Sequence, residues 1–119
     1  MMAKVLIIED EVNIRIFVAV NLEMRGYVVV QASDGSEGLR LLRTAAPDLL
    51  ILDMRLPDMS GVDVLETMTD DDTIRHIPVI LMTASVNLAE LKDYPNLVQR
   101  LVKPVSVSVL LQTVQAALP

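Results

Sequence analysis

Five side chains that could carry chemistry stand at the ends of apolar runs in this 119-residue chain. They are Glu9, Asp10, Asp53, Thr83 and Lys103. If the runs are parallel strands, these groups meet at one edge of a sheet, which is where open α/β sheets bind their ligands. Three carboxylates brought together repel one another, and a hard cation that prefers oxygen ligands, such as Mg²⁺, relieves that repulsion. The five residues therefore predict a magnesium site suited to phosphate.

An aspartate can be the nucleophile of phosphoryl transfer and form an aspartyl phosphate. Asp53 is the candidate because it stands alone, whereas the adjacent Glu9 and Asp10 are better placed to hold the metal. Lys103 can pair with a phosphoryl oxygen as a point charge, and the Thr83 hydroxyl can donate to another. Each residue taken singly has a simpler explanation, such as capping a helix. Their joint placement favours phosphoryl transfer.

The elements that would position these residues are five short runs rich in Val, Ile and Leu, as expected of buried parallel strands. The runs cover residues 4–8, 27–31, 49–52, 79–82 and 98–102. Segments of helical character alternate with them, which predicts an α/β fold of five strands and five helices, with helices on both faces of the sheet.

Boundary residues support this division. Gly26 can end the first helix in the left-handed conformation, Asp34 with Glu37 forms a candidate capping box, and Ser60 is a candidate N-cap of the third helix. The fourth helix, expected within residues 86–95, is short because Pro95 limits it.

The first helix carries two apolar stripes, of which only one can face the sheet. One consists of Ile14, Val18 and Leu22, and the other of Ile16, Val20 and Met24. The second stripe is either buried by neighbouring loops or a surface for a partner.

Composition limits the classes of protein to consider. The length predicts a single domain over residues 1–119, and the absence of cysteine excludes disulfides and thiol chemistry. A formal charge of −6 argues against direct binding to nucleic acid. No apolar stretch is long enough to cross a membrane and no cleavable signal pattern is present, so we expect a cytoplasmic protein.

Four segments resemble the signature blocks of response-regulator receiver domains, the CheY-like family of two-component signalling. They are residues 8–11 (IEDE), 53–61 (DMRLPDMSG), 83–84 (TA) and 103–104 (KP). The resemblance implies a flavodoxin-like, doubly wound (βα)5 sandwich whose parallel strands run in the order 2-1-3-4-5.

The resemblance also implies roles for particular residues. Asp53 would be the phosphoacceptor, and Mg²⁺ would be held by Glu9, Asp10, Asp53 and the backbone carbonyl of Arg55. Thr83 and Lys103 would bind the phosphoryl group. The group would come from a histidine kinase, a phosphotransfer protein or a small phosphodonor, and would be lost by hydrolysis. Such a domain catalyses its own phosphorylation and dephosphorylation and is not a turnover enzyme. Its output would be a changed interaction with a downstream protein or effector domain, or a homodimer.

One departure from the family pattern bears on the switch. Receivers usually carry an aromatic switch residue three positions before the lysine, where this chain has Arg100, so Thr83 and Arg100 form the expected switch pair. Arg100 and the short fourth helix motivate an alternative, a pseudo-receiver that binds partners independently of phosphorylation.

Two enzyme classes on similar topology fit less well. A flavin-binding flavodoxin needs a Ser/Thr/Gly phosphate loop where this chain has residues 9–11 (EDE). A metal nuclease or topoisomerase-like domain would carry Asp-x-Asp where the chain reads DMR.

Overall fold

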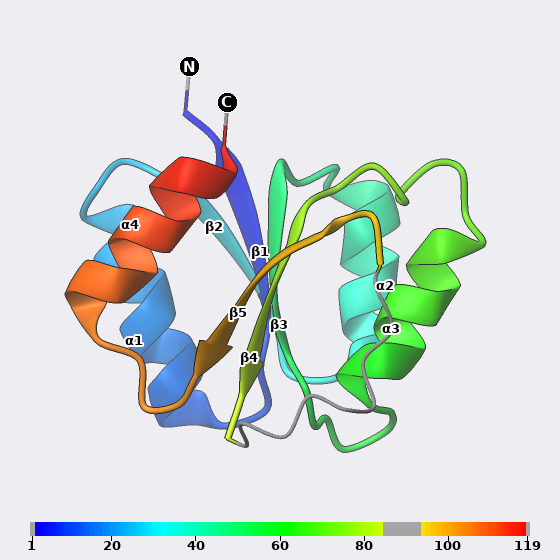
Figure 1. The fold of residues 1–119 in the computed structure, drawn as a ribbon, viewed down its shortest axis with the longest axis horizontal. Helices are drawn as coiled ribbons and strands as arrows, with labels where there is room; N and C mark the ends of the chain where they lie inside the picture. Colours follow the sequence, from blue (N-terminus) through cyan, green and yellow to red (C-terminus); the bar gives the residue numbers. More distant parts are fainter. Residues whose placement is uncertain (1, 85–93, 119) are drawn as a thin grey trace.

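A five-stranded parallel sheet forms the centre of the fold (Figure 1), as seen in a computed structural model that describes residues 2–84 and 94–118. The strands are β1 (Lys4–Ile8), β2 (Val28–Ala32), β3 (Leu49–Asp53), β4 (Val79–Thr83) and β5 (Leu97–Val102). They run in the order β2-β1-β3-β4-β5 with every neighbouring pair parallel. The predicted strands and their order are confirmed, with each strand end within one residue of its predicted position.

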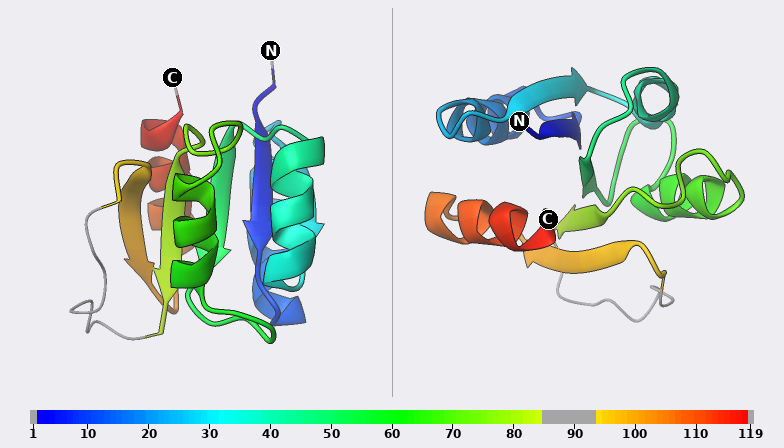
Figure 2. Two further views of the ribbon diagram at one scale, coloured as in Figure 1. Left: turned by 90° about the vertical axis from the view of Figure 1, so that its right-hand side faces the viewer. Right: turned by 90° about the horizontal axis from the view of Figure 1, so that it is seen from above.

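Helices cover both faces of the sheet. Along the described residues they are α1 (Val12–Glu23), α2 (Gly35–Thr44), α3 (Gly61–Thr69) and α4 (Val107–Ala117). Helices α1 and α4 lie on one face, and α2 and α3 on the other (Figures 1 and 2). Residues 86–93 of the predicted fourth helix lie outside the described residues, so the last predicted helix is the one labelled α4.

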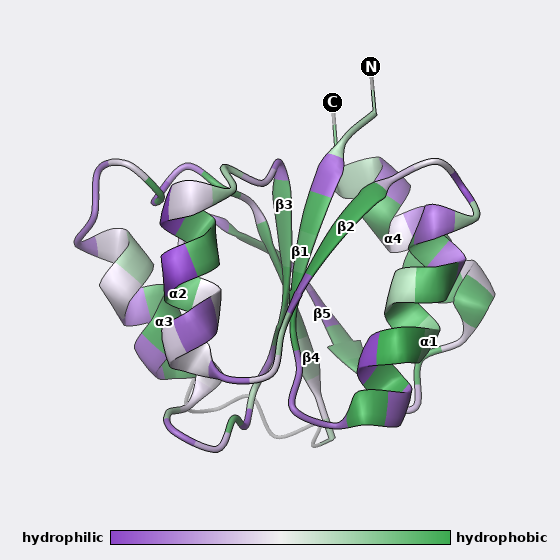
Figure 3. Cartoon of the chain, turned by 180° about the vertical axis from the view of Figure 1, so that it is seen from behind, coloured by the Kyte–Doolittle hydropathy of each residue, from purple (hydrophilic) through white to green (hydrophobic). Residues whose placement is uncertain are grey.

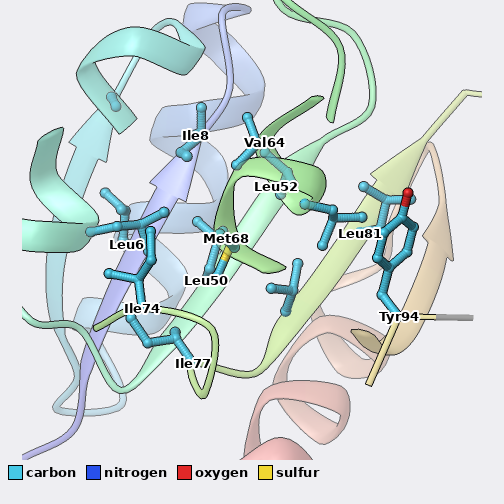
Figure 4. Close-up of a cluster of buried hydrophobic side chains, with 14 residues drawn as sticks. Leu6, Ile8, Leu50, Leu52, Val64, Met68, Ile74, Ile77, Leu81 and Tyr94 are labelled. Carbon is cyan, nitrogen blue, oxygen red and sulfur yellow. The ribbon is translucent and has the colours of Figure 1, made fainter. Parts of the chain in front are cut away.

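Burial on both faces explains why the strands read as continuous apolar runs rather than alternating ones. Successive β3 residues point to opposite faces, so Leu50 and Leu52 pack toward α2 and α3 (Figure 4), while Leu49 and Ile51 pack toward α1 and α4. All five β3 residues, including Asp53, are buried. The core therefore fixes the position of the β3 carboxyl end.

The predicted helix boundaries are largely as expected. Gly26 follows α1 with a φ of 90°, and Ser60 and Asp63 form a reciprocal capping box at the start of α3. The Asp34 side chain accepts the N–H of Glu37 at 2.8 Å. The other half of that predicted box is absent among the described contacts, because the Glu37 carboxylate pairs with Arg40 at 2.6 Å instead.

Helix α1 is hydrophobic along much of its length (Figure 3), and its second apolar stripe is exposed to solvent. Val18 and Leu22 of the first stripe are buried against the sheet, whereas Ile16, Val20 and Met24 are 48%, 45% and 78% exposed. Burial of this stripe by loops, one of the two alternatives, is therefore wrong. In the described ranges, no helix combines the length and apolar character needed to cross a bilayer.

Candidate functional site

The polar residues at the strand ends converge as predicted. Glu9 and Asp10 follow β1, Asp53 ends β3, Thr83 ends β4, and Lys103 follows β5. The Lys103 N–H donates to the Thr83 carbonyl at 2.8 Å, so the β4–β5 ladder delivers both side chains to one edge. This edge is at the bottom of Figure 1, opposite both chain termini.

Three carboxylates form a cluster at this edge. Glu9, Asp10 and Asp53 each offer an oxygen, and these oxygens lie within 4.8 Å of one another. Glu9 is fully buried and Asp53 is 5% exposed, whereas Asp10 is open to solvent. The cluster therefore combines two carboxylates fixed by the core with one that faces the surrounding solution.

Lys103 bridges the two buried carboxylates. Its Nζ lies 2.6 Å from Oε1 of Glu9 and 2.9 Å from Oδ1 of Asp53. Burial by itself lowers the pKa of Lys103, but the hydrogen bonds to Glu9 and Asp53 outweigh it and hold the pKa above its usual value. The side chain is therefore a stable ammonium.

At Glu9, the effect of burial on the pKa outweighs that of the hydrogen bonds. Burial raises the pKa of Glu9 above its usual range, although the hydrogen bonds from Lys103 and from the Glu11 N–H oppose that rise. The nearby Asp53 charge raises it further. The pKa values of Glu9 and Lys103 are thus both raised, but by different causes: burial dominates at Glu9, and the hydrogen bonds to the carboxylates dominate at Lys103.

The charge balance of the site fits a divalent cation. Three carboxylates face one ammonium, which leaves two negative charges in the fully ionised cluster. Oxygen-only ligands with one member open to solvent suit Mg²⁺, which keeps several of its own waters. The donor set therefore fits the predicted metal.

The loop after β3 approaches the Asp53 backbone closely. The Gly61 N–H donates to the Met54 carbonyl at 2.7 Å, and a Cβ at Gly61 would lie 2.7 Å from the Asp53 carbonyl oxygen and 3.0 Å from the Met54 Cα. Arg55 and Ser60 form an antiparallel bridge across the loop. Only glycine fits at this contact, so the signature glycine supports the backbone of the candidate phosphoacceptor.

The same loop is tied to α2. Oxygens of the Asp58 carboxylate accept the N–H groups of Gly35 and Ser36 at 2.8 and 2.9 Å. These bonds hold the pKa of Asp58 below its usual value. Asp58 thus occupies free N–H groups at the start of a helix 22 or more residues away in sequence.

The predicted switch residues lie on one face of the sheet. Arg100 is in register with Leu81, which stands two residues before Thr83 on β4. The side chains of Arg100 and Thr83 therefore both project toward the α3 side, as Leu81 does. Thr83 is buried. Arg100 is half-buried, and its Nε is a buried atom without a hydrogen-bond partner in the described parts of the chain.

Arg15 makes a contact with the site that the sequence did not predict. Its guanidinium reaches from α1 to the backbone carbonyl of Glu9, with Nη1 at 2.8 Å. The signal available was a basic residue one turn into the helix that follows two carboxylates. His76, the only histidine of the sequence, is exposed.

Comparisons with known proteins agree with this geometry. The family described as the response regulator receiver domain matches residues 5–115. The polar-differentiation response regulator DivK of Brucella anthropi is 43% identical over 81 residues, which cover 67% of this chain and 65% of that protein. DivK of Brucella ovis is 41% identical over 85 residues, covering 71% of this chain and 68% of its own length. The first alignment thus spans just under two thirds of the relative it matches.

Solved structures agree over almost the whole chain. The chemotaxis response regulator CheY4 of Vibrio cholerae superposes with a TM-score of 0.90 at 30% identity, covering 99% of this chain and all of that one. The response regulator TrrA of Thermotoga maritima, in complex with Mg(2+)-BeF, gives a TM-score of 0.87 at 27% identity. The match covers 98% of this chain and 100% of that one. The fold, the acidic cluster and the family match together show that this chain belongs to the response regulator receiver domains of two-component signalling.

Proposed function

We propose that this domain accepts a phosphoryl group on Asp53 from a histidine kinase or a phosphotransfer protein, with Mg²⁺ as its cofactor. The observation that supports this most is the buried Asp53 carboxylate, held at 2.9 Å by Lys103 inside a cluster of three carboxylates. The name of the TrrA structure, which includes magnesium and a beryllium fluoride group, points in the same direction.

In the proposed step, a carboxylate oxygen of Asp53 attacks the phosphorus of the donor. An O–P bond forms, the bond between phosphorus and the donor's nitrogen or oxygen breaks, and the leaving group keeps the bonding electron pair. The Lys103 ammonium, which lies between Glu9 and Asp53, then pairs with the negatively charged phosphoryl oxygens and stabilises them. Thr83, buried at the end of the neighbouring strand, donates its hydroxyl to another of these oxygens.

The residues proposed to hold Mg²⁺ are Glu9, Asp10, Asp53 and the backbone carbonyl of Arg55. Both carboxylate oxygens of Glu9 already accept hydrogen bonds, at 2.6 Å from Lys103 and at 3.2 Å from the Glu11 N–H. Asp10 and Asp53 are therefore the better direct ligands. When bound, Mg²⁺ supplies neutralisation of the carboxylates and of the phosphoryl oxygens, and hydrolysis of the acyl phosphate resets the domain.

The test is the intact mass of the chain after incubation with acetyl phosphate and Mg²⁺. The expected result is a phosphoryl adduct that forms only with Mg²⁺ and is lost in Asp53→Asn. Asp72→Asn is the matched control, because the Asp72 side chain is 83% exposed and pairs with Arg75 away from the cluster. The proposal is wrong if the adduct persists in Asp53→Asn, or if the folded wild-type chain takes no group from saturating donor.

The proposed output is a changed protein interaction. Phosphorylation of Asp53 would draw Thr83 toward the phosphoryl group, and Arg100, on the same face of the sheet, would respond to the space left behind. The affected surface would include β5 and α4, for a downstream partner, an effector domain or a homodimer. Size-exclusion chromatography with and without beryllium fluoride tests this route, which fails if neither self-association nor partner affinity changes.

The second candidate function is a phosphorylation-independent pseudo-receiver. Arg100 favours it, because the usual aromatic residue is replaced by an arginine whose buried Nε has no hydrogen-bond partner among the described residues. In either case the domain is proposed to act in the cytoplasm as a signalling module and not as a turnover enzyme. The mass experiment separates the two candidates, since a pseudo-receiver forms no adduct.

A further inference from the structure

A single arginine ties the peptide between the two proposed metal-binding carboxylates Glu9 and Asp10 to α1. Arg15 lies in the first turn of α1, and its Nη1 donates to the Glu9 backbone carbonyl at 2.8 Å. Its Nε donates to Oε1 of Gln31 on β2 at 3.2 Å. One planar guanidinium thus connects the end of β1, the start of α1 and the neighbouring strand.

The Glu9 carbonyl needs such a donor. Glu9 is fully buried, and the pairing of β1 with β2, the strand that its N–H faces, ends one residue earlier, at Ile8 and Ala32. A buried carbonyl without a partner is costly, and the great majority are therefore hydrogen-bonded. The Glu9 N–H is already bonded to the Ala32 carbonyl of β2 at 3.0 Å. With Arg15 on the carbonyl, both polar groups of the Glu9 backbone are fixed.

We propose that Arg15 is a positioning residue for the metal site, holding the Glu9–Asp10 peptide so that both carboxylates face Asp53. This inference rests on the proposed function, because it assigns a role in binding the same Mg²⁺. Asp10 depends most on this positioning, since it is exposed and has no core packing to orient it. Residues that orient metal ligands typically contribute about 10- to 100-fold in metal affinity, and a bond to the backbone belongs at the lower end.

The charge of Arg15 alone would change the Mg²⁺ affinity in the opposite direction, which makes the inference testable. Arg15 carries a positive charge beside a cation site, so its charge alone weakens Mg²⁺ binding. Removing a residue that acted only through its charge would tighten binding. Removing a positioning residue loosens it.

The experiment measures Mg²⁺ dissociation constants by isothermal titration calorimetry on the full chain. Arg15→Met is expected to bind about tenfold more weakly than wild type, and Arg15→Lys, which keeps the charge and one donor, about threefold more weakly. Arg25→Met, the same substitution at an exposed position beyond the far end of α1, is the control and is expected to match wild type. Urea unfolding verifies that each variant is folded, and Arg15→Lys carries the test if Arg15→Met is not.

A second readout separates metal binding from chemistry. At saturating Mg²⁺, the rate of phosphorylation by acetyl phosphate in Arg15→Met is expected to return to within threefold of wild type, since only the metal affinity is impaired. Unchanged or tighter Mg²⁺ binding in the Arg15 variants overturns the inference, as does a rate that stays low at saturation. Failure of the wild-type chain itself to bind Mg²⁺ overturns the proposed function together with this inference.

Discussion

Replacing Gly61 by alanine should damage the site through the backbone of Asp53. The new Cβ would lie 2.7 Å from the Asp53 carbonyl oxygen, 3.0 Å from the Met54 Cα and 3.3 Å from a Leu81 methyl, where ordinary contacts begin near 3.4 Å. The first two are main-chain atoms, which cannot rotate away as a side chain would. The loop or the end of β3 must therefore shift by several tenths of an ångström.

The expected magnitude is the difference of two terms. Overpacking of a tight contact costs about 1–3 kcal/mol, and alanine at a helical position returns at most about 0.5–1 kcal/mol relative to glycine. We expect a net loss of about 1–2 kcal/mol in the free energy of unfolding. Because a displacement of about 1 Å can cost about 100-fold in rate, a shift of a few tenths of an ångström should slow phosphorylation about tenfold.

Gly26→Ala is the matched control. Gly26 has a φ of 90° with nothing within 4 Å of an added Cβ, so alanine there costs about 1–2 kcal/mol through backbone strain alone. Both variants should lose similar stability in urea unfolding, but only Gly61→Ala should slow adduct formation with acetyl phosphate. Equal rates in the two variants would refute the argument that Gly61 positions the phosphoacceptor, and unchanged stability in Gly61→Ala would refute the packing argument itself.

Three further predictions follow from the electrostatics and capping. Lys103→Met leaves the buried Glu9 carboxylate without its cation, so unfolding in EDTA should show a loss of about 3 kcal/mol at pH 8. The loss should shrink toward pH 5, because the raised pKa of Glu9 lets it take up a proton, and the double variant Glu9→Gln/Lys103→Met should recover most of it. Bonds from Thr73 and Arg43 lower the pKa of Asp71 to about 2, so its contribution to stability is present above the unfolded pKa of about 3.9. Stability of the wild-type chain should therefore fall between about pH 4 and about pH 2 more steeply than that of Asp71→Asn in acid titrations of unfolding. Ser60→Ala removes the N-cap of α3 and should lower the free energy of unfolding by about 1 kcal/mol in urea, an idea that an unchanged midpoint would contradict.

The fold was predictable because its signals are local. Continuous apolar runs identify buried parallel strands, and the helices between them require crossovers in one hand, so strand ends were predicted to within one residue. The convergence of Glu9, Asp53 and Lys103 follows from the same reasoning, since the carboxyl ends of parallel strands share an edge. The C-terminal end of α1 and the start of α3 were also predictable, because Gly26 and Ser60 act on residues close to them in sequence.

Contacts between distant side chains required the tertiary structure. No sequence spacing shows that the Lys103 ammonium lies between Glu9 and Asp53, that Asp58 caps α2 from another loop, or that Arg15 bonds the Glu9 carbonyl. The apolar stripe at Ile16 and Val20 likewise left two interpretations open until its exposure was known. The sequence determined which residues stand at the ends of strands, because that depends on periodicity along the chain. The tertiary structure decided which atoms meet there, because rotamers, loop paths and burial depend on distances between segments far apart in sequence.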